Sequence, residues 1–208
     1  MKKRILSLLL LAVMLLPLAG CGDSKDDTVN EVELQAKYTV SEQATNYVLI
    51  EMEDGGKMLL ELFPDKAPIT VANFQKLVGE GFYDGIIFHR VIENFMIQGG
   101  DPLGTGYGGS DETITGEFSA NGIANDISHT RGTISMGRLS GDNNSASSQF
   151  FICHVDYPYL DGNYAAFGRM IDGFDTLDKI ATTKTDSSDK PVNEQKMKRV
   201  VFVTLDEQ

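Results

Sequence analysis

The chain has 208 residues, of which 41% are hydrophobic and 23% are charged. This balance is typical of a globular protein with one sizeable core, and the length suits one or two domains. The formal net charge of −12 argues against a nucleic-acid partner, because phosphate binding requires a basic surface.

Residues 1–20 are typical of a secretory signal peptide. A basic start at residues 2–4 precedes an apolar stretch over residues 5–18, which is short for a membrane span. The stretch ends in Leu-Ala-Gly before Cys21 and resembles the bacterial lipobox. This resemblance implies a diacylglycerol on the Cys21 thiol and a lipid anchor at the extracytoplasmic face of the cell membrane. An ordinary signal peptide with an accidental cysteine is the less favoured alternative.

Residues 21–45 are polar and acidic, which predicts a flexible tether ahead of a domain over residues 46–208. A weak apolar pattern over residues 29–37 allows a short helix that would be marginal alone. If Cys21 carries lipid, Cys153 has no intramolecular partner. Its apolar surroundings predict a buried core residue and not a nucleophile.

The start of the domain predicts a β-hairpin followed by a helix. Residues 47–53 and 57–62 alternate apolar and polar side chains, so each strand is expected to bury one face. The Asp-Gly-Gly between them predicts the turn. Apolar residues then repeat at helical spacing between Pro68 and Gly79, which are typical of a helix start and stop.

The remaining chain predicts strands joined by long polar loops. Strands are expected at residues 86–92, 134–136, 150–155, 165–170 and 200–205, a second short helix at residues 174–180, and loops through much of residues 99–145 and 182–193. Many strands, few helices and glycine-rich turns favour a mainly β fold closed into a barrel.

Residues 88–101 read Phe-His-Arg-Val-Ile-Glu-Asn-Phe-Met-Ile-Gln-Gly-Gly-Asp and form the most informative stretch. Arg90 lies among mostly apolar neighbours, where its guanidinium must find an acceptor or stay in water. Composition alone favours a structural pair between Arg90 and a carboxylate. The other interpretation is a shallow apolar pocket with one strong donor at its edge.

Two further segments accompany this stretch: Ser-Ser-Gln-Phe-Phe-Ile at residues 147–152, and Leu-Asp-Gly at residues 160–162 followed by Phe-Gly at residues 167–168. Together the three segments resemble the signature of cyclophilin-type peptidyl-prolyl cis–trans isomerases. The resemblance covers residues 46–205. It implies a closed eight-stranded antiparallel barrel capped by two helices. It also implies an isomerase that acts on X-Pro bonds of unfolded or partly folded proteins and needs no cofactor.

The resemblance further implies the site. Arg90 matches the family's catalytic arginine, with Phe95 and Gln98 beside it as the other residues assigned to catalysis. The matching substrate-binding positions are Met96, Gly104, Gly137, Arg138, Gln149, Phe151, Tyr159, Leu160 and Tyr164. The aromatic and aliphatic members would clamp the proline ring while Arg90 stabilises the twisted amide.

Two tyrosines depart from the family pattern. Tyr159 stands where many eukaryotic members have tryptophan, and Tyr164 stands where they have histidine. These changes predict weakened binding of cyclosporin, a family inhibitor, more than weakened catalysis. The loop over residues 139–146 is also slightly longer than in the animal members.

Other motifs are less informative. Residues 104–109 contain a formal Gly-x-Gly-x-x-Gly, but no helical pattern follows, so we reject a nucleotide site; in cyclophilins this loop borders the substrate groove. His89, His129 and His154 lack metal-ligand spacing, which argues against a metal site. No Gly-x-Ser-x-Gly elbow supports a hydrolase.

Two rival functions stay open on these grounds. One is a binding module that holds proline-containing segments of exported chains, and the other is a structural envelope lipoprotein. The joint presence of Arg90, Phe95 and Gln98 favours the enzyme. The expected role is the folding of exported proteins at the membrane surface, by a protein that we expect to be a monomer.

Overall fold

The computed structural model describes residues 34–206, so the expected signal peptide, Cys21 and the first part of the expected tether lie outside the described residues. The helices are α1 (Pro68–Gly79) and α2 (Phe174–Ala181), and the strands are β1 (Tyr38–Ser41), β2 (Tyr47–Met52), β3 (Lys57–Leu62), β4 (Arg90–Ile92), β5 (Met96–Gly99), β6 (Thr133–Met136), β7 (Phe150–Cys153), β8 (Ala166–Asp172) and β9 (Met197–Leu205). The predicted mainly β fold with two helices is confirmed.

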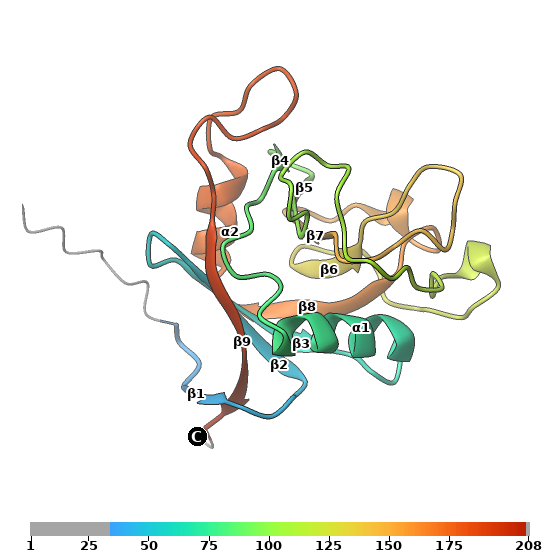
Figure 1. The fold of residues 1–208 in the computed structure, drawn as a ribbon, viewed down its shortest axis with the longest axis horizontal. Coiled ribbons are helices and arrows are strands. Elements are labelled where there is room, and N and C mark those ends of the chain that lie inside the picture. Colours follow the sequence, from blue (N-terminus) through green and yellow to red (C-terminus); the bar gives the residue numbers. More distant parts are fainter. Residues whose placement is uncertain (1–33, 207–208) are drawn as a thin grey trace, which may run out of the picture.

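All nine strands form one antiparallel sheet in the order β1-β9-β2-β3-β8-β6-β7-β5-β4. The prediction of a closed eight-stranded barrel is not confirmed, because within residues 34–206 no ladder joins the edge strands β1 and β4. Figure 1 shows these two strands well apart, with the loops over residues 110–132 and 137–149 on the side away from β9. The ninth strand, β1, pairs along β9 and was not expected from the sequence.

β2 and β3 form the predicted hairpin, but each strand buries both of its faces. The inner face carries the main core, as expected. Leu49 and Leu59 point the other way and are also buried, because they pack with Val203 beneath Leu34 and Tyr38. Residues 34–45 therefore belong to the folded part, and this described portion of the expected tether is not a free linker.

The predicted strand over residues 86–92 is shorter in the structure. Ile87 makes only an isolated bridge to Lys196, and the regular ladder begins at Arg90. The final strand is longer than expected, because it begins at Met197 and pairs with both β1 and β2. Neither helix within residues 34–206 is long and apolar enough to cross a membrane.

α1 begins at Pro68 because a carboxylate from a distant loop satisfies its first backbone donors. Ala67 at the N-cap offers no side-chain acceptor. Glu117, which is 2% exposed, accepts hydrogen bonds from the Ile69 N–H at 3.1 Å and from the Thr70 N–H at 2.8 Å. A negative charge is also favourable at a helix N-terminus. Glu117 thus anchors the loop over residues 101–131 to the helix.

Glu117→Ala should lower the free energy of unfolding by about 3 kcal/mol, because it leaves the buried N–H group and hydroxyl of Thr70 and the partly buried N–H group of Ile69 without their acceptor. Urea unfolding at pH 7 measures this loss. Glu112→Ala is the control, since it removes an exposed partner of Lys76 and should leave stability nearly unchanged. Equal effects of the two substitutions would contradict the capping role of Glu117.

Candidate functional site

A cavity of about 160 Å³ lies where β4, β5 and β7 meet the loops after β6 and β7. Its lining consists of Arg90, Phe95, Met96, Gln98, Gly137, Arg138, Phe151, Leu160 and Tyr164. All of these were predicted as site residues from the sequence. Three other predicted residues, Gly104, Gln149 and Tyr159, lie outside this cavity.

The strand register explains how the polar and apolar walls come together. Arg90 of β4 lies opposite Gln98 of β5, and Gln98 lies opposite Phe151 of β7. Met96 and Gln98 are two residues apart on one strand, so their side chains share a face. Met96 is 1% exposed and Phe151 is 5% exposed, whereas the Arg90 side chain is 40% exposed. A half-exposed guanidinium thus stands at the rim of an apolar pocket.

The Arg90 guanidinium is held only loosely. Its Nε lies 3.6 Å from the Asp189 carboxylate, and its NH1 lies 3.5 Å from the Gln98 side-chain oxygen. The structural interpretation, in which Arg90 pairs with a carboxylate, therefore holds in part. Both side chains of that pair are about half exposed, so it contributes under about 1 kcal/mol. Arg90 keeps donors available for a ligand in the cavity.

A relay of amide side chains ties Gln98 to the glycine-rich loop. The Gln98 amide donates to the Gln149 side-chain oxygen at 2.8 Å. The Gln149 amide in turn donates to the carbonyl oxygens of Gly106 at 3.0 Å and Gly108 at 2.7 Å. Gln149 therefore positions the loop beside the cavity rather than facing the cavity around Arg90.

The apolar wall is a small cluster separate from the main core. Met96, Phe151 and Cys153 are buried in it. The ring of Phe151 meets that of Tyr164 edge-on, with the centroids 5.7 Å apart. Burial, helped by the nearby carboxylates of Asp161 and Asp156, raises the pKa of the Cys153 thiol to about 12. Cys153 is thus the buried and unreactive residue that the sequence predicted.

Two predicted residues, Tyr159 and Gly104, do not line the cavity around Arg90 or the cavity that adjoins it. Tyr159 is 85% exposed and touches the ring of Tyr157, whose own ring packs on Phe95. The short 3₁₀ helix Pro158–Leu160 turns Leu160 toward the pocket and Tyr159 to solvent. Gly104 has a φ of 62°, and its carbonyl accepts from Lys190. It shapes the loop over residues 101–109 without lining a cavity.

A second cavity of about 260 Å³ adjoins the first. It shares Gln98, Gly137 and Arg138 with the first cavity, and it adds Gln149 and the loop over residues 106–110. The two cavities together form one groove along which an extended peptide could lie. Arg138 stands at their junction.

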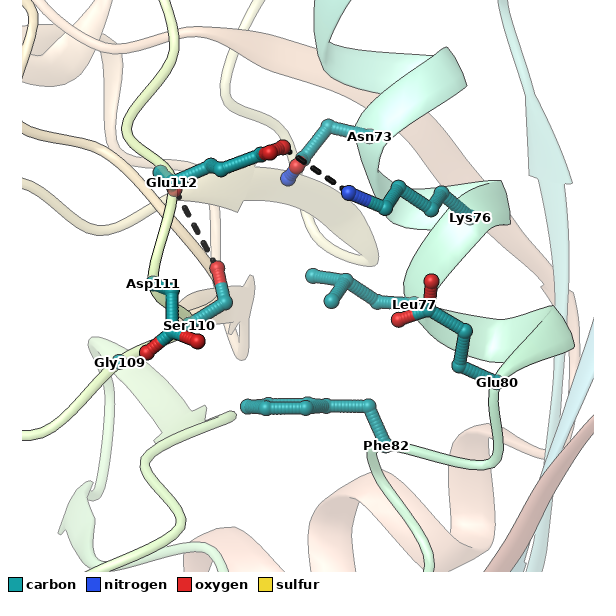
Figure 2. A pocket seen from close by; sticks show the side chains of 9 residues that line it. All are labelled: Asn73, Lys76, Leu77, Glu80, Phe82, Gly109, Ser110, Asp111 and Glu112. Carbon is teal, nitrogen blue, oxygen red and sulfur yellow. Dashed lines mark hydrogen bonds and ion pairs between the residues drawn. The ribbon is translucent and has the colours of Figure 1, made fainter.

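A third cavity, of about 220 Å³, lies on the other side of Gly109 and Ser110. Figure 2 shows α1 on one side of it and the loop over residues 109–112 on the other, joined by the Lys76–Glu112 ion pair of 2.9 Å. A larger cavity of about 600 Å³ lies near Arg169, at a distance from the site in the sequence and the fold. Neither cavity contains a predicted site residue.

A buried polar chain behind the pocket was missed from the sequence. His129 Nδ1 lies 2.8 Å from the Asp161 carboxylate, and its Nε2 lies 3.0 Å from the Ser135 hydroxyl. Its ring stacks on that of Phe151, and Asp161 follows the pocket residue Leu160. Ser135 is 0% exposed, so this Ser-His-Asp order cannot act as a hydrolase triad. It supports the pocket wall from behind.

The three histidines have different surroundings. Burial lowers the pKa of His129, although its hydrogen bond to a carboxylate opposes this shift. Burial also lowers the pKa of His89, whose ring nitrogens have no partner in the structure. His154 accepts from the Asn94 N–H at 3.0 Å and lies 3.1 Å from Asp178. Within residues 34–206 no three His, Cys, Asp or Glu side chains gather as metal ligands would.

Asp101 organises the loop that borders the groove. This carboxylate is 1% exposed and accepts from the N–H groups of Leu103 at 2.7 Å, Thr105 at 2.9 Å and Gly106 at 2.6 Å. Burial would raise its pKa, but the several backbone hydrogen bonds outweigh burial and hold the pKa below its usual value. The ionised form is therefore the one that stabilises the loop.

Because the folded-state pKa of Asp101 is lowered, its stabilising contribution is complete above the unfolded-state pKa of about 3.9 and is lost as pH falls through the folded value. Asp101→Asn should therefore be less stable than the wild type at pH 7, and the gap should narrow below about pH 4. Urea unfolding from pH 7 to pH 3 measures the gap, with the exposed Asp111→Asn as control. A gap that stays constant with pH would contradict this account.

Comparisons with known proteins agree with this geometry. A family model described as "Cyclophilin type peptidyl-prolyl cis-trans isomerase/CLD" matches residues 47–202. The chain is 45% identical over 147 residues to peptidyl-prolyl cis-trans isomerase ppi1 of Schizosaccharomyces pombe. This alignment covers 70% of this chain and 92% of the relative. The chain is also 47% identical over 131 residues to peptidyl-prolyl cis-trans isomerase B of Bacillus subtilis, covering 63% of this chain and 86% of the relative.

The fold is also similar to that of a solved cyclophilin-type isomerase from Cryptosporidium parvum, whose crystal structure was determined in the presence of the dipeptide Ala-Pro. The TM-score is 0.69 at 37% sequence identity, and the match covers 74% of this chain and 97% of the solved chain.

Proposed function

The chain belongs to the cyclophilin-type peptidyl-prolyl cis–trans isomerases, and on this premise we propose that it assists the folding of exported proteins at the membrane surface. The enzyme class follows from the family. The observation that carries the proposal for the site is the grouping of Arg90 with apolar walls in one cavity. The presence of Ala-Pro in the related crystal structure agrees with a proline-sized occupant.

The reaction requires no nucleophile, because no covalent bond is broken. Amide resonance opposes rotation of the X-Pro bond by about 18–20 kcal/mol, and the uncatalysed change takes tens to hundreds of seconds. Raising the rate from about 10⁻² to about 10³ per second requires about 7 kcal/mol of transition-state stabilisation. The site must supply this difference through binding alone.

We assign this stabilisation to two parts of the cavity, the apolar wall and the Arg90 guanidinium at its rim. Phe95, Met96, Phe151 and Leu160 hold the proline ring by apolar contact, which restrains one side of the rotating bond. In the twisted amide the nitrogen lone pair becomes a hydrogen-bond acceptor, and Arg90 can donate to it. This interaction is stronger in the twisted state than in the planar ground state, which is what catalysis requires.

The cellular location is proposed from the N-terminus. Residues 1–20 have the pattern of a signal peptide, and the small residues before Cys21 resemble a lipobox. Two acyl chains give stable membrane anchoring. Labelling cells with an alkyne palmitate analogue should tag the wild type and Cys153→Ser but not Cys21→Ser. A tagged Cys21→Ser protein, or an untagged wild type, would refute the anchor.

The folding role is tested by refolding an exported protein whose slow phase is limited by X-Pro isomerisation. Wild-type protein should accelerate that phase, and Arg90→Ala should not. If Arg90→Ala suppressed aggregation and improved yield as well as the wild type did, the chain would act as a binding module instead.

A further inference from the structure

Arg138 occupies a special place in the groove. It lies in the loop after β6 and lines both the cavity around Arg90 and the adjoining cavity around Gln149. Any peptide whose proline enters the first cavity must pass Arg138 to reach the second. The side chain can therefore meet the residues next to the proline.

The Arg138 guanidinium is fixed in place by neutral groups. It lies 4.8 Å from the ring centroid of Tyr164 and 5.3 Å from that of Phe118. Its Nε donates to the Asn163 carbonyl at 3.1 Å, and its NH1 donates to the Leu139 carbonyl at 3.0 Å. A donor group held in this way loses little conformational entropy when it binds a ligand.

The charge of Arg138 has no counterpart within the described part of the chain. The other four arginines of residues 34–206 each lie within ion-pair distance of a carboxylate: Arg90 with Asp189, Arg131 with Asp178, Arg169 with Glu61 and Arg199 with Glu51. Arg138 has only carbonyl and aromatic partners there. In a protein of formal net charge −12, an unpaired and partly buried guanidinium beside the substrate groove calls for an explanation.

We propose that Arg138 selects acidic substrates by binding the carboxylate of an Asp or Glu side chain within two residues of the substrate proline. A guanidinium binds a carboxylate through paired, charge-assisted hydrogen bonds. The net negative charge of the protein repels acidic chains at long range, so this recognition acts only at contact. The inference rests on the isomerase function and adds a substrate class to it. The opposing interpretation is that Arg138 only packs against the Tyr164 ring and supports the lining of the cavity, without contacting the substrate.

The test uses proline peptides in matched pairs, with Glu or Gln at each of the two positions before and after the proline. Exchange NMR measures cis–trans interconversion of every peptide without a coupling protease. For at least one position, wild-type protein should prefer Glu over Gln by about fivefold in kcat/KM at low salt, with the difference mainly in KM. Raising the salt from about 0.05 M to about 0.5 M should reduce the preference.

Two variants distinguish direct contact between Arg138 and the substrate carboxylate from the long-range effect of the protein's net charge. In Arg138→Gln the kcat/KM for a Glu peptide divided by that for its matched Gln peptide should fall to about one, whatever the absolute rates are. Arg169→Gln is the matched control, because Arg169 also stacks on an aromatic ring, that of Phe63, but lies away from the groove. It removes the same charge and should keep the preference. Circular dichroism checks that both variants are folded.

The outcomes are distinguishable. If the wild type accelerates the Gln peptides but shows no Glu preference at any position, the role of Arg138 is overturned and the isomerase function stands. A preference that survives in Arg138→Gln, or that is lost equally in Arg169→Gln, overturns it as well. If the wild type is inert on every peptide, the isomerase assignment fails and this proposal fails with it.

Discussion

Arg90→Ala should lower kcat/KM for X-Pro isomerisation by about 10²–10³-fold, which corresponds to about 2.7–4 kcal/mol of transition-state stabilisation. Arg90, Gln98 and Arg138 each bring side-chain N–H donors to the lining of the apolar proline cavity. The distances of 3.6 Å from Arg90 to Asp189 and 3.5 Å from Arg90 to Gln98 leave its guanidinium free to turn toward the substrate nitrogen. A protease-coupled assay on a short peptide measures the loss.

The fall should appear mainly in kcat, because the lost hydrogen bond forms only in the twisted amide. Arg90→Lys should be intermediate, since a lysine keeps the charge but not the planar fork of donors. The midpoint of urea unfolding should change little, because the Arg90 side chain is 40% exposed and its ion pair is weak. Near-normal activity of a folded Arg90→Ala would refute the assignment of Arg90.

Phe150→Ala should lower the free energy of unfolding by about 4 kcal/mol, the largest stability effect that we expect from one side chain. Phe150 is 0% exposed at the centre of the aromatic core. Its ring centroid lies 5.7 Å from that of Phe74, 5.5 Å from that of Tyr83 and 6.0 Å from that of Phe88. Removing the ring leaves a cavity that the three neighbouring aromatic side chains cannot easily fill.

Urea unfolding measures this loss, and Phe82→Ala is its control. Phe82 meets the same Tyr83 ring at 5.4 Å but is only partly buried, so its removal should cost much less. Equal losses for the two variants would show that Phe150 is not the centre of the core. Because Phe150 lies between Gln149 and Phe151, its loss should also weaken peptide binding.

The local features of the fold could be predicted because their signals lie close together in the sequence. Pro68 and Gly79 mark both ends of α1, and the helically spaced Val71, Phe74, Leu77 and Val78 are buried as their spacing predicts. The β2–β3 hairpin follows from its alternation and its Asp-Gly-Gly turn. Most of the site was predicted from the family resemblance and not from hydrophobic periodicity. Periodicity relates residues within one helix or strand, so it cannot connect Arg90 with Tyr164.

The features that the sequence did not predict depend on contacts between distant segments. β1 is a short strand in a polar region, and it is stabilised by pairing with β9 and by the packing of Tyr38 on a small apolar cluster. Asp189 reaches Arg90 from a loop almost one hundred residues away in the chain. The chain of Ser135, His129 and Asp161 likewise joins two segments, because Asp161 lies 32 residues beyond His129 in the sequence. Tyr159 was expected in the pocket, but the 3₁₀ helix directs it to solvent.

The most direct test of the central claim is exchange NMR on an X-Pro peptide mixed with isotope-labelled protein. The claim is that one cavity both holds the proline and accelerates rotation of its bond. It predicts cis–trans exchange peaks at catalytic protein concentration, together with amide shift changes at Gln98, Gly137 and Phe151. Binding that shifts the amides of Glu80 and Asp111 instead, or binding at the cavity without exchange peaks, would contradict it.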